Sequence, residues 1–294
     1  MQFELLLDYG VELAETPIWD PRIGKWYWTD LFKGTVYRYT PENEESEKWE
    51  TGGRIGAAIP CKDNTNTLLC VTENGAHYLD LTTGKLTLIV DPENGNPLNQ
   101  YNDSRVDAVG RLFMSSVARL YGTEAYTPDM LGALYMVDAD RKTVSCIVEG
   151  IQQYNTIAWN TQSTRMYAVD TYNQKLLSFP YDLSKGPVGG PEIVLDLAPY
   201  GTPDGLSFDI EDNLYICHWS GKITVWSSEL SFVREIPFPV EYVCCGGFGG
   251  ADMCHFIVAS SKYCYTDEQL ARNKGAGGLF IARSDIPGRP DYFY

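Results

Sequence analysis

The chain of 294 residues is 44% hydrophobic and 13% aromatic, enough apolar material for a full core without disulfides or a structural metal. Its formal net charge of −16, from 39 acidic and 23 basic residues, argues against nucleic acid or an anionic membrane as a partner, because both require clustered Lys and Arg. No segment approaches the roughly 20 apolar residues of a membrane span. Met1–Asp8 lacks the basic and apolar regions of a signal peptide, so we expect a cytoplasmic protein.

Short apolar and aromatic runs alternate with turn signals from one end of the chain to the other. Each run has the length of a strand and is rich in strand-forming residues; examples are residues 25–29, 67–71, 111–115, 165–169 and 213–217. Helical periodicity is nearly absent, and the one helix we expect is short, near Asp267–Lys274. The sequence therefore predicts an all-β protein.

An internal repeat runs through these strands. Four segments of similar form are each followed by a strand rich in Leu, Tyr or Trp: Pro17–Asp20, Ser104–Asp107, Ile157–Asn160 and Leu206–Asp209. Two weaker copies are Ala58–Cys61 and Gly246–Gly249. The copies recur every 40 to 53 residues, the length of one four-stranded propeller blade.

Six repeats predict a six-bladed β-propeller that occupies residues 1–294 as a single domain. A β-sandwich rarely shows six self-similar units, and a β-helix would need a shorter period. Phe3–Leu7 has no blade of its own, and we expect it to pair beside Gly278–Ala282 in the last blade, where it would close the ring. The alternative is a frayed N-terminus.

A propeller brings equivalent positions of its blades together around one axis. Five residues before each repeat anchor lie Glu15, Gly56, Asn102, Asn155, Asp204 and Cys244. Four of these six side chains are oxygen donors, two carboxylates and two amides, and such a set suits Ca²⁺, Mg²⁺ or Mn²⁺. Zn²⁺ is possible, although it usually prefers His or Cys. The alternative is that these residues cap turns, as Asn and Asp often do.

The same residues carry a resemblance to the senescence-marker/regucalcin and gluconolactonase family over nearly the whole chain. The family motifs occur in order, at residues 14–20 (Ala-Glu-Thr-Pro-Ile-Trp-Asp), 100–111, 155–160, 203–215 and 277–280. Each motif alone is weak, but the ordered set at family spacing is specific. The resemblance implies a six-bladed propeller that holds one divalent cation at the mouth of its tunnel, with Ca²⁺ or Mg²⁺ favoured.

By the same resemblance, the metal ligands fall on Glu15, Asn155 and Asp204, and a substrate-contacting residue falls on Asn102. Members of the family hydrolyse sugar lactones and related cyclic esters. We therefore expect a divalent-metal-dependent lactonase in which Asp204, in Pro203-Asp204-Gly205, is also the general base. Its partner is a small cyclic ester or sugar-derived substrate.

Three features bear on substrate recognition. Gln100 stands where the family has an Arg that meets substrate hydroxyls, so typical aldonolactone specificity is in doubt. Arg105 is a candidate substrate contact, with a structural ion pair as an equal alternative. The insertion 117–131, which contains Tyr121, is a candidate lid over the substrate, or else a surface excursion.

Two other functions remain open at this stage. A metal-dependent isomerase, epimerase or other hydrolase could use the same site, and the missing Arg at position 100 motivates this alternative. A non-catalytic calcium-binding regulatory protein would also explain converging oxygen ligands. A protein-interaction platform is disfavoured, because such platforms need no carboxylates in the tunnel.

Overall fold

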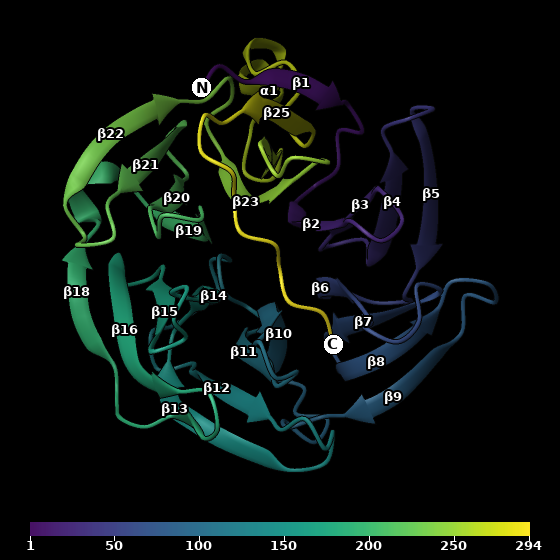
Figure 1. Cartoon of the computed structure of the whole chain (residues 1–294), viewed down its shortest axis with the longest axis vertical. Helices are drawn as coiled ribbons and strands as arrows, with labels where there is room; N and C mark the ends of the chain where they lie inside the picture. The colour runs from purple at the N-terminus through teal and green to yellow at the C-terminus, as the bar shows by residue number, and fades with distance from the viewer.

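A computed structural model describes all 294 residues. Its strands form six sheets arranged around a central axis, the blades of a β-propeller (Figure 1). The innermost strands of neighbouring blades contact one another around the whole ring: β2 with β6, β6 with β10, β10 with β14, β14 with β19, β19 with β23, and β23 with β2. The prediction of six blades is confirmed.

The first three blades each contain four antiparallel strands in chain order. Blade 1 comprises β2 (Ala14–Asp20), β3 (Lys25–Asp30), β4 (Thr35–Thr40) and β5 (Glu45–Glu50). Blade 2 comprises β6 (Ile55–Pro60), β7 (Thr67–Thr72), β8 (Gly75–Asp80) and β9 (Leu86–Val90). Blade 3 comprises β10 (Asn99–Val106), β11 (Leu112–Ala118), β12 (Gly132–Val137) and β13 (Val144–Ile151).

The remaining blades vary this plan. Blade 4 comprises β14 (Tyr154–Trp159), β15 (Arg165–Asp170), β16 (Lys175–Asp182), the short β17 (Gly186–Pro187) and β18 (Glu192–Asp196). Blade 5 comprises β19 (Pro203–Phe208), β20 (Leu214–His218), β21 (Lys222–Trp226) and β22 (Phe232–Pro237). Blade 6 comprises β23 (Val243–Gly249), β24 (His255–Ser260), β25 (Leu279–Arg283) and β1 (Glu4–Leu7).

Burial decreases from the axis outward within each blade. Every residue of the inner strands β2, β6, β10 and β23 is buried, whereas β5 and β22 are almost entirely exposed. The sequence follows this gradient, because β5 reads Glu-Ser-Glu-Lys-Trp-Glu and β6 reads Ile-Gly-Ala-Ala-Ile-Pro. The inner strands are therefore buried on both faces, and the polar residues that they contain need a separate reason.

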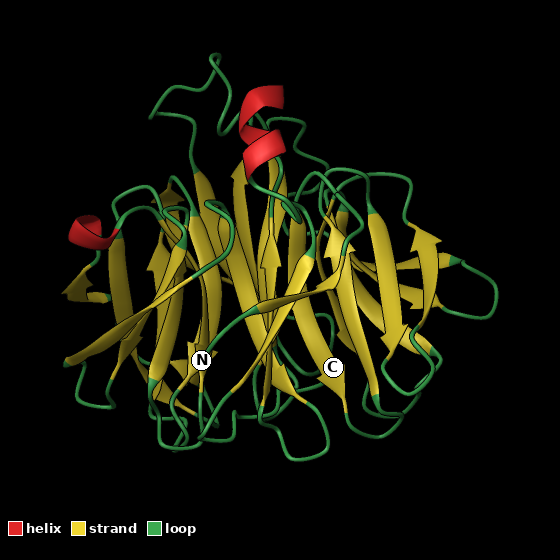
Figure 2. Cartoon of the chain, turned by 90° about the horizontal axis from the view of Figure 1, so that it is seen from above, coloured by secondary structure: helices red, strands yellow, loops and turns green.

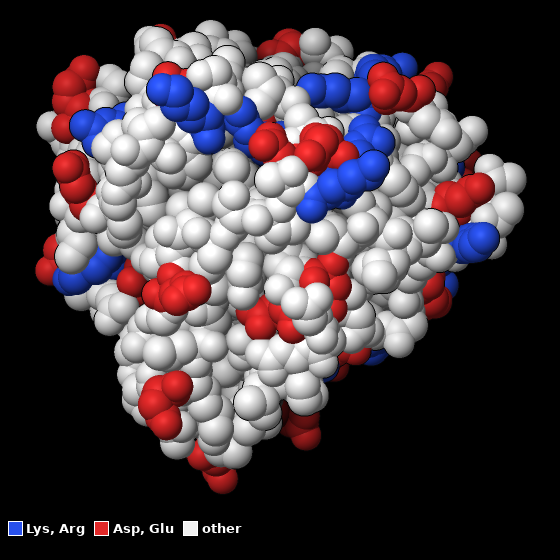
Figure 3. Space-filling model, turned by 90° about the horizontal axis from the view of Figure 1, so that it is seen from below, with Lys and Arg blue, Asp and Glu red and all other residues white.

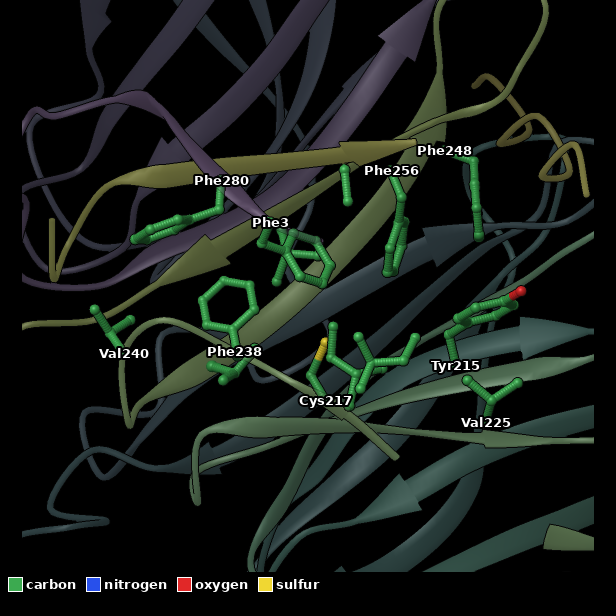
Figure 4. Packing of buried hydrophobic residues seen from close by; sticks show 14 of the residues in the cluster. Phe3, Tyr215, Cys217, Val225, Phe238, Val240, Phe248, Phe256 and Phe280 are labelled. Carbon is green, nitrogen blue, oxygen red and sulfur yellow. The ribbon is translucent and has the colours of Figure 1, made fainter. Parts of the chain in front are cut away.

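The ring closes through the N-terminal strand. β1 pairs antiparallel with β25, with Leu5 opposite Phe280, and the predicted pairing of the first strand with the last blade is confirmed. Phe3 anchors this strand in the largest core cluster, with its ring 4.8 Å from that of Phe238 (Figure 4). The last blade thus takes strands from both ends of the chain, which leaves no gap in the ring.

The C-terminal segment after β25 crosses the axis (Figure 1). The backbone N–H of Arg289 donates to the carbonyl of Phe208 in blade 5 at 3.1 Å. Tyr294 N–H then donates to the carbonyl of Pro60 in blade 2, also at 3.1 Å. A cavity of only about 50 Å³ remains between this tail and the inner strands. The tail therefore closes one end of the central tunnel, which the repeat pattern did not predict.

Helices are minor elements of the fold. The expected short helix is present as α1 (Asp267–Arg272), which begins with a capping box between Thr266 and Gln269, and a 3₁₀ helix covers Ala198–Tyr200. Figure 2 shows α1 beyond the strand ends on one face of the propeller. Neither helix is long and apolar enough to cross a membrane. The face drawn in Figure 3 carries basic and acidic side chains near one another.

A buried histidine in blade 5 makes stability depend on pH. His218 has no exposed surface, and its ring nitrogens contact the Gly201 carbonyl at 3.2 Å and the Thr224 hydroxyl at 2.8 Å. Burial lowers the pKa of His218 from 6.5 to about 4. Between these values the unfolded chain binds more protons than the folded one, so the stability that depends on neutral His218 is lost as pH falls from 6.5 toward 4.

We expect the burial of neutral His218 to lower the free energy of unfolding by about 3 kcal/mol as the pH falls from 6.5 to 4. The variant His218→Gln is uncharged at every pH and should lack this contribution, so its deficit relative to wild type should shrink as pH falls. Urea unfolding of both proteins between pH 4 and 8 measures the difference. Parallel pH profiles for the two proteins would contradict the assignment.

Candidate active site

A local irregularity recurs at the same place in all six inner strands. In each blade the pairing of the first strand with the second shifts register, between residues 15 and 18, 55 and 57, 101 and 104, 154 and 157, 203 and 206, and 243 and 246. The six positions identified by the repeat lie at or within these irregularities. A β-bulge redirects a side chain out of the alternating pattern of the strand. The repeat therefore encodes six bulged positions, and at the five of them that are not glycine the bulge sets the direction of a side chain.

These bulges surround a cavity of about 270 Å³ at the end of the tunnel opposite the C-terminal tail. Six of the predicted site residues line it: Glu15, Gln100, Asn102, Tyr121, Asn155 and Asp204. They come from blades 1, 3, 4 and 5. Gly56 explains why blade 2 gives no side chain at this level, because a Cβ atom there would lie 2.0 Å from the backbone oxygen of Asn102.

Asp204 is held by a single hydrogen bond. The indole N–H of Trp219 donates to its Oδ2 at 2.6 Å, while its Oδ1 is buried and has no hydrogen-bond partner. A buried carboxylate oxygen without a partner is costly, and its presence in a native fold calls for an explanation. One oxygen is thus fixed by the protein, and the other is available to a ligand.

Glu15 has a contact of another kind. The Cys245 thiol donates to Glu15 Oε2 at 2.9 Å, and the backbone N–H of Thr16 donates to the same sulfur at 3.0 Å. Thr16 has a φ of 49°, an unusual conformation for a β-branched residue. Strained backbone of this kind is often found at functional sites, and here it belongs to the bulge that positions Glu15.

The two carboxylates disfavour each other's ionisation. Burial raises the pKa of Glu15 to about 8, and the nearby Asp103 adds to this effect. The pKa of Asp204 is also well above its ordinary value, chiefly because of burial and secondarily because of repulsion from Glu15. Two such groups at close range are stabilised as anions only by a compensating positive charge.

Both amides leave their oxygens free. Asn155 Nδ2 donates to the hydroxyl of Thr171 at 3.3 Å, and Asn102 Nδ2 donates weakly to the carbonyl of Tyr154 at 3.4 Å. With the amide nitrogens directed to the protein, the oxygens can accept from a substrate or coordinate a cation.

The donor set fits a divalent cation. Ligand atoms of Glu15, Asp204 and Cys244 all lie within 4.8 Å of one another, and all three residues are buried. The unpartnered Asp204 oxygen and the mutual repulsion of the carboxylates are the features that a cation would satisfy. Because most of the available donors are oxygens, the set suits hard cations.

Two predicted substrate contacts line the same cavity. Gln100 Oε1 accepts a hydrogen bond of 2.8 Å from Arg54. Tyr121, in the 117–131 insertion, packs edge-on against Tyr126 with ring centroids 5.0 Å apart. Burial raises the pKa of the Tyr121 phenol, so it stays neutral and able to donate. The insertion therefore reaches the cavity, as a lid would.

Arg105 does not join this group. Its guanidinium forms a buried ion pair with Asp103 and donates to the Ser104 carbonyl at 3.1 Å, and the residue lines the small cavity beside the C-terminal tail. The cause is its place near the far end of β10, beyond the bulge. The structure thus contains the ion pair that the sequence offered as the alternative, and it places Arg105 outside the cavity that holds the other candidate residues.

Four residues around the cavity were not assigned roles from sequence: Arg54, Trp219, Cys244 and Cys245. Cys244 occupies the sixth repeat position, so the repeat predicts its location near the site. It was given no role because its sulfur differs from the oxygen donors at the other positions. Trp219 and Arg54 lie outside the repeated positions, and they reach the site through contacts across strands or blades. No local signal identifies either residue.

Comparison with known proteins identifies the group to which this architecture belongs. The family model described as the SMP-30/gluconolactonase/LRE-like region matches residues 13–262. Regucalcin from Gallus gallus is 25% identical over 290 residues, covering 95% of this chain and 94% of that protein. L-arabinolactonase from Azospirillum brasilense is 25% identical over 289 residues, covering 98% of this chain and 93% of that protein.

A solved structure supports the same fold. The crystal structure of a calcium-binding protein, regucalcin, from Agrobacterium tumefaciens superposes with a TM-score of 0.91. It is 24% identical in sequence, and the match covers 99% of this chain and 96% of that chain. The six-bladed ring described above is therefore shared with a known propeller.

Proposed function

The chain belongs to the SMP-30/gluconolactonase/LRE-like family, and we propose that it is a divalent-metal-dependent hydrolase that opens a sugar lactone or a related cyclic ester. In this proposal residues 1–294 act as one propeller domain. Relatives named as lactonases support the reaction class at about 25% identity. The observation that carries the proposal is the unpartnered Asp204 oxygen beside Glu15 in a buried cavity of substrate size.

Glu15, Asn155 and Asp204 are the proposed ligands of the cation, and their oxygens favour Ca²⁺ or Mg²⁺. When bound, such an ion withdraws electron density from the ring carbonyl of the substrate and stabilises the charge that develops on its oxygen. Cys245 helps to position Glu15 as a ligand, because its thiol donates a hydrogen bond that fixes the orientation of the Glu15 carboxylate.

The protein residues supply the remaining functions. Asp204 accepts a proton from the water that attacks the carbonyl carbon, and Trp219 holds its carboxylate in one orientation. The bond between the carbonyl carbon and the ring oxygen then breaks, and that oxygen takes up a proton to give a hydroxy acid. The amide oxygen of Asn102 accepts a hydrogen bond from a substrate hydroxyl. Tyr121, in the 117–131 insertion, limits the access of bulk water to the cavity.

We expect hydrolysis of at least one sugar lactone that is abolished by EDTA and restored by a divalent cation. The measurement is kcat/KM, corrected for spontaneous hydrolysis, on a panel of aldonolactones and other cyclic esters with Mg²⁺, Mn²⁺, Ca²⁺ and Zn²⁺ in turn. A sugar panel tested in parallel detects isomerisation or epimerisation. If metal binds tightly but no cyclic ester is turned over, the hydrolase proposal is wrong and a non-catalytic calcium-binding role is favoured.

A further inference from the structure

An arginine from blade 2 lies in the candidate active site. Arg54 immediately precedes β6 and is half-buried, and it lines the cavity that also contains Glu15 and Asp204. No other Lys or Arg lines that cavity. The cavity is therefore lined by one cationic side chain and two carboxylates.

The Arg54 guanidinium has no carboxylate partner. It stacks over the ring of Phe32, 4.9 Å from the centroid, and donates to Gln100 Oε1 at 2.8 Å. None of the ion pairs in the structure includes Arg54. In a chain with a net charge of −16, a half-buried arginine without an anionic partner is conspicuous, because carboxylates are abundant. Most of its N–H groups are free to bind a ligand.

Gln100 extends this group of donors. An arginine can only donate, so the Gln100 oxygen must face Arg54 and its NH₂ group must face away. The Gln100 oxygen is therefore already engaged by Arg54, and the groups that the pair has left for a ligand are N–H donors. A pair of donor side chains suits a ligand group that only accepts hydrogen bonds, such as a carboxylate or a phosphate.

We propose that Arg54 and Gln100 bind an anionic substituent of the substrate, so that this protein prefers lactones carrying a carboxylate or a phosphate over neutral lactones. This inference rests on the proposed lactonase function for the reaction, but the anion site itself does not depend on it. The cation that the family resemblance expects at position 100 is thus supplied from the neighbouring blade. The cavity therefore contains an arginine, but its guanidinium comes from the segment that precedes β6.

The test compares three lactones: glucono-1,5-lactone, which is neutral, glucaro-1,4-lactone, which carries a carboxylate, and 6-phosphogluconolactone. Wild type should show at least tenfold higher kcat/KM on one of the two anionic substrates, and the better one identifies the anion. Arg54→Gln should lower kcat/KM on that substrate by about 10–100-fold, mainly through KM, because a charge-assisted contact is lost. Its kcat/KM on glucono-1,5-lactone should fall by a much smaller factor, so the ratio of kcat/KM between the anionic and the neutral lactone measures the lost contact.

Three further variants separate charge from geometry. Arg54→Lys should recover only part of the loss, because an ammonium lacks the planar fork. The double variant Arg54→Gln/Gln100→Arg moves the single cation to the other member of the pair and should restore anion preference. Arg234→Gln, on the exposed strand β22, removes the same charge elsewhere and should behave as wild type.

Equilibrium binding keeps this inference separate from the lactonase proposal. Calorimetry measures the Kd of glucarate, gluconate and 6-phosphogluconate for wild type and Arg54→Gln at one fixed Mg²⁺ concentration. Glucarate or 6-phosphogluconate should bind more tightly than the monoanion gluconate, and loss of that difference in Arg54→Gln supports the anion site even if no lactone is hydrolysed. If lactones are hydrolysed but Arg54→Gln weakens the binding of gluconate and of the more highly charged ligands equally, or of none of them, the inference is overturned and the lactonase proposal stands.

Discussion

Replacing Asp204 with asparagine is expected to lower kcat/KM for lactone hydrolysis at least a hundredfold. The change removes the proposed general base, and loss of such a group typically costs about 10²–10⁴ in rate. It also removes one of the two negative charges available to a cation at the tunnel mouth. The side-chain volume is nearly unchanged, so the melting temperature with saturating metal should change little.

Trp219 makes this substitution more severe than its size suggests. The indole can only donate, so an asparagine at 204 must turn its oxygen toward Trp219 and its NH₂ group toward the cavity. The position that a cation needs would then present a donor instead of an oxygen. Adding Trp219→Phe to Asp204→Asn releases this constraint, so the double variant should bind Mg²⁺ or Mn²⁺ more tightly than the single variant without regaining the rate.

Calorimetric metal titration and steady-state kinetics together check this prediction. Asp285→Asn is a matched control, because Asp285 is exposed and makes no ion pair or hydrogen bond through its side chain, and it should retain full activity. Near-full activity of Asp204→Asn would refute the role given to Asp204. Recovery of the rate in the double variant would show that Asp204 acts as a ligand and that another group is the base.

Truncating Phe3 to alanine is expected to lower the free energy of unfolding by about 3–5 kcal/mol, the usual cost of removing a buried phenylalanine. Phe3 is only 8% exposed and packs against the rings of Phe238 and Phe256 (Figure 4). It also anchors β1, whose pairing with β25 completes the last blade. The loss therefore combines a cavity in the core with a weakened closure of the ring.

Leu5 on the same strand provides the comparison. It is 43% exposed, so Leu5→Ala removes a smaller apolar group from a much less buried site on the same strand and should cost about 1 kcal/mol. Urea unfolding gives both values, and hydrogen exchange of the β25 amides shows whether the blade opens locally. Equal costs for the two variants would mean that Phe3 does not anchor the closure.

The six repeated bulges connect the fold to its proposed chemistry. Each inner strand is buried on both faces, and a regular strand would direct alternate side chains into the neighbouring blades. The bulges break that alternation at the equivalent position of each inner strand. Those in β2 and β19 direct Glu15 and Asp204 into the same cavity. A glycine or a cysteine can occupy the same level without disturbing the ring, as Gly56 and Cys244 do.

The sequence alone was sufficient for the architecture and for the positions of the candidate ligands. Strand length, turn residues and the recurring segments are local properties, and they repeat in register with the blades. The spacing of Glu15, Asn102, Asn155 and Asp204 relative to the repeat places them at one level, so their convergence follows once the blades surround an axis. The pairing of Phe3–Leu7 with the last strand followed from the same count, because one strand was left without a blade.

Only the tertiary structure decided which side chains surround that level and what they do to it. Trp219 donates a hydrogen bond to Asp204 across paired strands, and Arg54 donates one to Gln100 from another blade. Arg105 forms an ion pair with Asp103 outside the candidate site. The tail that closes the far end of the tunnel contacts blades 5 and 2, far from it in sequence. Such contacts depend on how the blades are placed relative to one another. The repeat in the sequence does not specify that placement, because every blade has the same pattern of strands and turns whichever residues face its neighbours.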